Sequence, residues 1–159
     1  MGSILNIEAV IGDAAELELS AAEIEDVLAV AYLAMRADGR LSEEEIDSFE
    51  RAVAAYYGEE AKPHQATTLM DRFAQQAANQ GLSPMLAQVA GRLSRVDARH
   101  EAYKLAYGMS LGDLDTNDNE YLFEDELREA LGIPEEVAES LIDEVIDAVG
   151  ADEEDDEED

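Results

Sequence analysis

The chain contains no cysteine and only ten basic residues in 159 positions. The absence of cysteine excludes disulfide bonds, thiolate metal sites and cysteine nucleophiles, and it favours a reducing compartment. No apolar run approaches the roughly 18 residues that a membrane-spanning helix needs, and the first residues lack the basic segment of a signal peptide. We therefore expect a cytoplasmic protein without direct membrane insertion.

The scarcity of basic residues is accompanied by an excess of acidic ones. The chain has 40 Asp and Glu against 10 Lys and Arg, which gives a formal net charge of -30 at pH 7. Since proteins bind nucleic acids mainly through basic side chains that displace counterions from the phosphates, nucleic acid is not an expected partner. Such acidity is also typical of adaptation to high salt, and the sequence leaves that interpretation open.

Apolar residues recur at helical spacing through most of the chain, and no segment alternates with the period of two that a half-buried strand shows. Helix caps and breakers divide this pattern into segments. In chain order they are Ser20 with Glu23, Asp38-Gly39, Ser42, Gly58, Asn79 to Gly81, Ser83-Pro84, Val96, Gly132 with Pro134, and Gly150. The sequence thus predicts an all-α fold, a single compact helical bundle of about seven helices in residues 1–150. Residues 151–159 are predicted to be a disordered acidic tail.

Two stretches that separate predicted helices repeat the same pattern, and we call them the first corner (37–45) and the second corner (112–120). In each, an Asp is followed seven positions later by a Glu: Asp38 and Glu45 in the first, Asp113 and Glu120 in the second. An Ala-Tyr pair precedes both corners. The repeat predicts a pseudo-repeated helix-turn-helix corner.

Each corner taken singly is explained by a capping box, in which Ser42 or Asn117 caps the following helix and the Glu reaches back to the cap. Two corners packed together would instead gather four carboxylates, and oxygen ligands of this kind bind hard cations. The sequence thus predicts a candidate site for calcium or another divalent cation. Its ligands would be Asp38, Glu45, Asp113 and Glu120, with Asp115 and Asn117 as secondary ligands.

The second corner alone offers an alternative, a calcium sensor or buffer that uses the acidic loop 113–124. Positions one, three, five, seven and twelve of an EF-hand loop are matched by Asp113, Asp115, Asn117, Asn119 and Glu124. Asp118 stands where the EF-hand turn requires glycine, and Arg40 occupies the third position of the first corner. A standard EF-hand pair is therefore not expected.

The residues typical of catalysis do not form a recognisable set. Gly108 to Gly112 fits the G-x-S-x-G pattern of a hydrolase nucleophile, but that motif follows a strand, and here it ends a predicted helix. The two histidines, His64 and His100, lack the spacing of metal ligands. We expect no enzyme activity, and a metal-dependent hydrolase that uses the corner carboxylates remains a second alternative.

Three of the ten basic residues, Arg92, Arg95 and Arg99, recur at helical spacing on one predicted face. We call them the arginine stripe. One interpretation is ion pairing with acidic helices of the same chain. The other is an interaction surface for an acidic protein partner or for the acidic tail, and the sequence does not decide between them.

At its corners the chain resembles the tellurite-resistance TerB-like family, whose small helical domains carry an Ala-Asp-Gly...Glu signature twice. The matching residues are Ala37-Asp38-Gly39 with Glu45, and Asp113 with Glu120, Phe123 and Leu131-Gly132-Ile133. Leu114 replaces the glycine expected in the second copy. The similarity extends roughly from Ser20 to Val149.

The resemblance implies an all-α bundle with an acidic, calcium-binding site and a part in stress-linked protein complexes, which are often membrane-associated. We therefore expect a non-catalytic protein-interaction module related to stress or tellurite resistance. The oligomeric state and the identity of the partner do not follow from the residues.

Overall fold

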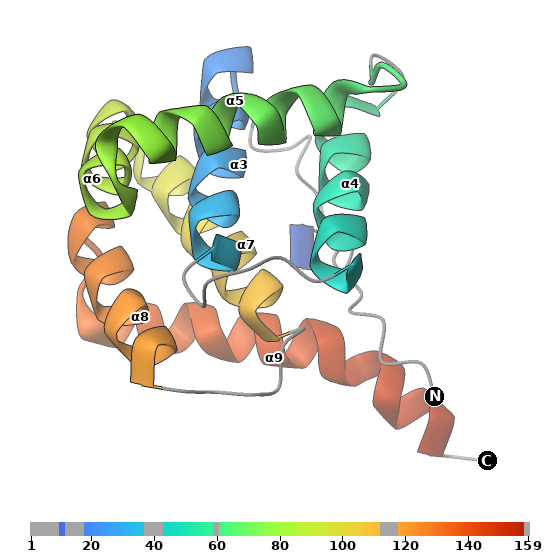
Figure 1. The fold of residues 1–159 in the computed structure, drawn as a ribbon. Helices are drawn as coiled ribbons and strands as arrows, with labels where there is room; N and C mark the ends of the chain where they lie inside the picture. The colour runs from blue at the N-terminus through green and yellow to red at the C-terminus, as the bar shows by residue number, and fades with distance from the viewer. Residues whose placement is uncertain (1–9, 12–17, 37–42, 59–60, 112–117, 158–159) are drawn as a thin grey trace.

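The computed structural model describes residues 10–11, 18–36, 43–58, 61–111 and 118–157 (Figure 1). Over these ranges the chain forms seven helices of at least eleven residues and no strand, so the predicted all-α bundle is confirmed. The helices are α3 (Ala21–Arg36), α4 (Glu43–Tyr57), α5 (Gln65–Gln80), α6 (Leu82–Arg92), α7 (Val96–Leu111), α8 (Asp118–Leu131) and α9 (Glu135–Glu157).

The helix α3 forms the centre of the molecule, because every residue from Asp26 to Met35 is buried. It packs most extensively against α7 and also contacts α4, α5 and α6. A helix that is covered on all sides must be apolar on all sides. The buried part of α3 is therefore wider than the single apolar face that the sequence pattern predicts.

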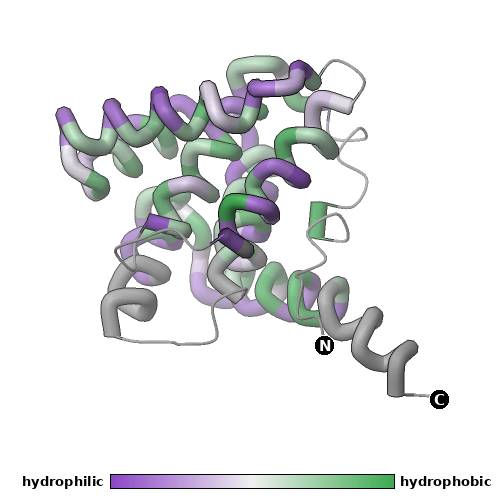
Figure 2. The backbone as a smooth tube through the Cα atoms, turned by 45° about the vertical axis from the view of Figure 1, so that its right-hand side comes forward, coloured by the Kyte–Doolittle hydropathy of each residue, from purple (hydrophilic) through white to green (hydrophobic). Residues whose placement is uncertain are grey.

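The core around α3 is built from large apolar side chains of several helices. Those that are almost completely buried are Tyr32, Tyr103, Phe49, Leu28, Leu33, Met35, Met85, Leu86, Leu93, Leu105 and Met109. Figure 2 shows hydrophobic and hydrophilic positions alternating along the helices, as expected where one side of each helix faces this core. Each buried side chain of this size contributes about 1.5–3 kcal/mol, so the core is the main source of stability.

Two predicted helix boundaries are confirmed in atomic detail. The Ser20 N–H donates to Glu23 Oε1 at 2.9 Å and the Glu23 N–H donates to Ser20 Oγ at 3.1 Å, which is the capping box predicted for α3. At the end of α8, Gly132 has φ +66° and the Ile133 N–H donates to the Arg128 carbonyl at 3.1 Å. This is a Schellman motif, and glycine suits its left-handed residue.

Two other boundaries differ from the prediction. The helix α6 begins at Leu82, so Pro84 lies third rather than first in the helix. Proline is tolerated there because the backbone donors of a first turn lack intrahelical partners in any case. The helix α9 continues to Glu157 past Gly150, where the sequence predicted its end. A glycine without a cap costs a helix about 1 kcal/mol, which does not suffice to end it.

Candidate functional site

The predicted cation site lies mostly outside the described residues. Asp38 falls in 37–42, and Asp113, Asp115 and Asn117 fall in 112–117. Glu120 lies in the first turn of α8, where the structure describes the backbone but not the side chain. The site therefore stays a prediction.

Glu45 is the one predicted ligand whose side chain is described. It lies in the first turn of α4, directly after the first corner, and only 5% of its surface is exposed. A carboxylate is costly to bury unless other groups compensate its charge. Its position thus puts a buried carboxyl group a few positions after Asp38 in the chain.

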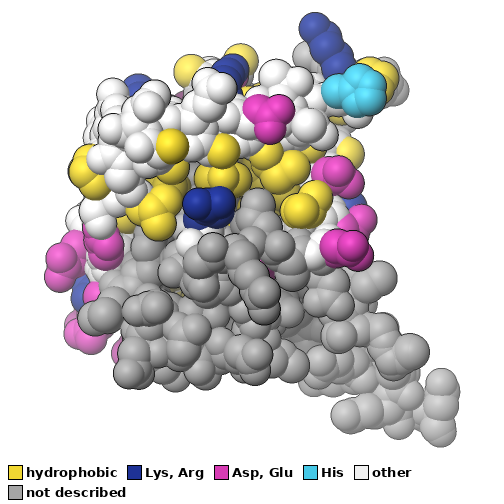
Figure 3. Space-filling model, viewed as in Figure 1, with side chains coloured by type: hydrophobic (Ala, Val, Ile, Leu, Met, Phe, Trp, Pro, Cys, Tyr) yellow, Lys and Arg dark blue, Asp and Glu magenta, His cyan; other side chains and the backbone are white. Residues whose placement is uncertain are grey.

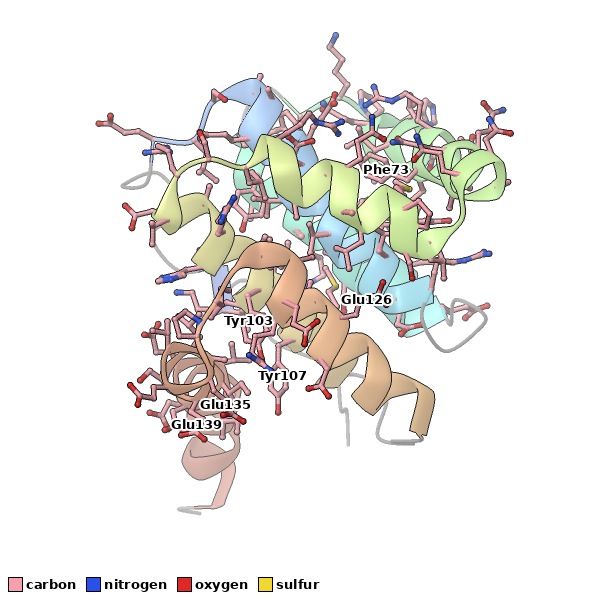
Figure 4. The ribbon with its side chains drawn as sticks, turned by 90° about the vertical axis from the view of Figure 1, so that its left-hand side faces the viewer. Phe73, Tyr103, Tyr107, Glu126, Glu135 and Glu139 are labelled. Atoms are coloured by element: carbon pink, nitrogen blue, oxygen red, sulfur yellow. The ribbon has the colours of Figure 1, made fainter. Side chains whose placement is uncertain are left out.

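The helices that precede the two corners are the central pair of the bundle. The Ala-Tyr pairs of the repeat lie on α3 and α7, which pack against each other, and both Ala31 and Ala106 are completely buried. The Tyr32 ring is tilted by 51° relative to the ring of Phe73 on α5, with ring centres 5.8 Å apart. Tyr107 stacks on Tyr103 of α7 at 6.5 Å, and Figure 4 shows these two rings close together. The repeat in sequence thus corresponds to two neighbouring helices in the fold.

Arg92 holds α6 against α3. Its Nη2 donates to Asp26 Oδ1 at 2.9 Å, and its Nε donates to Oδ1 at 3.2 Å and to Oδ2 at 3.4 Å. Asp26 is only 7% exposed. Pairing of two guanidinium nitrogens with both carboxylate oxygens makes this a bidentate, charge-assisted contact. The hydrogen bond with Asp26 raises the pKa of Arg92 above its ordinary value.

Arg95 binds the capping box of α3. Its Nε donates to Glu23 Oε2 at 2.9 Å and its Nη2 donates to Glu23 Oε1 at 3.1 Å. The same Glu23 carboxylate accepts the Ser20 N–H, so a single side chain caps α3 and binds Arg95. These hydrogen bonds, that from Arg95 first, lower the pKa of Glu23 below its ordinary value.

Arg99 lies on α7 and reaches the ends of two other helices. It donates from Nε to the Leu93 carbonyl after α6, and from Nη1 to the Leu131 carbonyl of α8 at 3.2 Å. Cations are favourable at helix C-termini, where carbonyl groups lack intrahelical partners. A Cβ on Gly132 would lie 3.1 Å from the same Nη1 atom, so the guanidinium would have to shift by a few tenths of an ångström to admit a side chain there.

The arginine stripe therefore does not lie on one helical face. Arg92 ends α6, Arg95 lies in the connection, and Arg99 belongs to α7, so the predicted common face is wrong because the helix ends before Arg95. Arg92 and Arg95 form ion pairs with Asp26 and Glu23 of α3, as the first interpretation expects, whereas Arg99 binds backbone carbonyls instead. Their use as an interaction surface stays a prediction.

A buried polar pair joins α4 to α7. The Tyr56 hydroxyl donates a short hydrogen bond to Glu101 Oε2, and Glu101 is only 3% exposed. Burial is the main cause that raises the pKa of both groups, and the Glu101 carboxylate raises that of Tyr56 further. Nearby, Lys104 Nζ lies 3.1 Å from Glu144 Oε1, which links α7 to α9.

The Tyr56–Glu101 pair was not predicted from the sequence. Glu101 shares an apolar helical face with Ala98, Ala102 and Leu105, all of which are buried. A charged residue within such a face indicates a buried polar group, and that signal was available in the sequence. Its partner Tyr56 lies 45 positions away, and no local pattern in the sequence identifies it.

Among the side chains that the structure describes, no three His, Asp or Glu residues are grouped closely enough to hold a metal ion. Of the described helices, none is both long and apolar enough to cross a membrane.

The fold is thus that of a small all-α domain, organised around one buried helix and with acidic corners after α3 and α7 in the chain. A family model described as tellurite resistance protein TerB matches residues 25–143. Since the match covers most of the chain, the chain belongs to the TerB family. Comparisons with curated proteins and with solved structures gave no match.

Proposed function

We propose that the chain is a non-catalytic protein-interaction module that acts in tellurite resistance or a related stress response. The observation that carries this proposal is the match to the TerB family over residues 25–143, together with an all-α fold. Two polar pairs among the described side chains support it, because they connect helices of the bundle. Tyr56 and Glu101 join α4 to α7, and Arg92 and Asp26 join α6 to α3.

The test of this proposal is tellurite tolerance in the native host. A strain that lacks the chain should tolerate less tellurite, and the wild-type chain supplied in trans should restore growth. A strain whose tolerance is the same with and without the chain would contradict a role in tellurite resistance. Phosphoester turnover with magnesium or manganese would instead favour the hydrolase alternative.

We propose further that the two corners share one divalent-cation site, with calcium as the expected ion. The repeated Asp-to-Glu spacing supports this, and so does the burial of Glu45 beside the first corner. In such a site Asp38, Glu45, Asp113 and Glu120 would supply carboxylate oxygens, with Asp115 and Asn117 as secondary ligands, and the ion would organise the corners rather than take part in a reaction.

Calorimetric titration with calcium separates this proposal from its alternative. A shared site predicts that Asp38→Asn and Asp113→Asn both reduce the heat of binding, whereas a loop site in 113–124 predicts that only Asp113→Asn does. Asp125→Asn, an exposed change outside both corners, is the control that should leave binding unchanged. No heat and no shift in melting temperature at millimolar calcium would exclude the ion.

A further inference from the structure

One part of this acidic molecule is almost devoid of carboxylates. Of the 40 acidic residues, only Asp71 lies between Ala61 and Val96, a stretch that forms α5 and α6. Arg72, the next residue, pairs with Glu25 of α3 at 2.7 Å, so its charge is compensated within the chain. Figure 3 shows mainly uncharged side chains over α5, while acidic ones lie mostly toward the left and right edges of the view.

The surface between α5 and α6 carries a connected group of amides, which we call the amide seam. Gln80 Nε2 donates to Gln88 Oε1 at 2.8 Å, and Gln76 Nε2 donates to the same Oε1 atom at 3.4 Å. All three hydrogen bonds of the group lie at the protein surface, the third joining Gln76 to Gln80 at 3.5 Å. Each amide has two N–H donors and a carbonyl with two lone pairs, so capacity remains for further partners.

Small side chains flank the amide seam. Ala74 and Ala78 are exposed on α5 one turn apart, and Ala87 is exposed on α6 next to Gln88. Side chains of this size lose no rotamer entropy when they are covered, and they allow another surface to approach the helices closely. Depletion of charge is also what distinguishes the centre of protein–protein interfaces from the rest of the surface.

We propose that the surface formed by α5 and α6 around the amide seam binds a second copy of this chain. With a net charge of -30, two copies repel each other wherever acidic faces meet, and the stretch that forms α5 and α6 contributes a single carboxylate to that repulsion. An amide surface is also complementary to itself, since it carries donors and acceptors together, and a twofold dimer requires such self-complementarity. This inference is independent of the proposed function.

Sedimentation equilibrium of the full chain at 0.15 M and 1 M NaCl tests the proposal. We expect a dimer whose dissociation constant falls at 1 M NaCl, because salt screens the repulsion between the remaining acidic faces. Gln88→Glu is the informative variant. Gln88 Oε1 already accepts both hydrogen bonds, so a carboxylate preserves them, yet it places one new negative charge on each copy at the interface.

We expect Gln88→Glu to raise the dissociation constant at 0.15 M NaCl by about tenfold or more, through repulsion between like charges. Ala87→Glu should have the same effect and covers the case in which Gln88→Glu alters folding. Ser140→Glu, which adds the same charge at an exposed position of α9, is the control and should change dimerisation little. A chain that stays monomeric at millimolar concentration in 1 M NaCl, or a dimer that both seam variants leave intact, overturns the proposal.

Discussion

Glu23 and Glu101 both accept a hydrogen bond from a side chain far away in the sequence, but they do so in opposite surroundings. Glu23 caps α3 near the surface and receives two hydrogen bonds from Arg95. Glu101 is buried and receives a hydrogen bond from the neutral Tyr56 hydroxyl. The pKa of Glu23 is lowered by its arginine, whereas burial raises the pKa of Glu101.

The difference shows what each carboxylate contributes to the fold. At the surface a charge is easily solvated, so the Arg95–Glu23 pair positions the start of α3 with little change in stability. In the interior a charge is costly to desolvate, and a hydrogen bond to it must be kept. The contact between α4 and α7 should therefore be sensitive to the loss of one hydroxyl, and the contact around Arg95 much less so.

The largest expected effect on stability is at the buried pair of Tyr56 and Glu101. Tyr56→Phe removes the donor and leaves the Glu101 carboxylate buried with one hydrogen bond fewer, which should lower the free energy of unfolding by about 1–3 kcal/mol at pH 7. Urea denaturation followed by circular dichroism measures this. Tyr57→Phe removes the hydroxyl of the next residue, which is only partly buried, and serves as the control. Equal losses in the two variants would mean that Glu101 does not depend on Tyr56.

A smaller effect is expected where the arginine partner is half-exposed. Arg92→Gln removes the bidentate contact to Asp26, whose side chain is 11% exposed, while the side chain of Arg92 itself is 48% exposed. We expect a loss of about 1 kcal/mol, because water can partly replace the guanidinium. Arg95→Gln should cost less than Arg92→Gln, since Glu23 is the more exposed acceptor. The same denaturation experiment compares them, and the reverse order would contradict this account of burial.

The parts of the fold that could be predicted from the sequence are those with local signals. The capping box of Ser20 and Glu23 spans four residues, and Gly132 with Pro134 marks the end of α8 within a few positions. The helical period of apolar residues can likewise be recognised within a single segment of the chain. These features follow from nearby residues and are present in the structure as expected.

The partners of the polar side chains could not be predicted in the same way. Arg92 meets Asp26 across 66 positions, and nothing local selects that residue among 40 acidic ones. The interpretation of the arginine stripe thus depended on the packing of α3 against α6. For the corners the limit is different, because Asp38 and Asp113 lie outside the described residues and the cation site stays a prediction.

The smallest effects are those of pH, and the two glutamates should respond with opposite signs. Glu23→Gln keeps the cap, because glutamine also serves in a capping box, but it removes the charge that faces Arg95. Since the folded-state pKa of Glu23 is lowered, its stabilisation is present above the unfolded pKa of about 4.3 and is lost as the pH falls through the folded pKa. Glu23→Gln should therefore be less stable than the wild type at pH 7, and the difference should shrink toward pH 3.

Glu101→Gln should do the reverse, since glutamine still offers Tyr56 an acceptor but cannot ionise. The folded-state pKa of Glu101 is raised, so its ionisation costs stability as the pH rises through that pKa, and the cost disappears as the pH falls below about 4.3. The variant should then be more stable than the wild type at pH 7 and gradually lose this advantage on acidification. The groups that face Glu101 are Tyr56, Lys104 and Glu144, and they are the same in both proteins. The measurement is the melting temperature of the wild type and of both variants from pH 3 to pH 8. If the difference from the wild type changed with pH in the same direction for both variants, burial would not distinguish the two carboxylates.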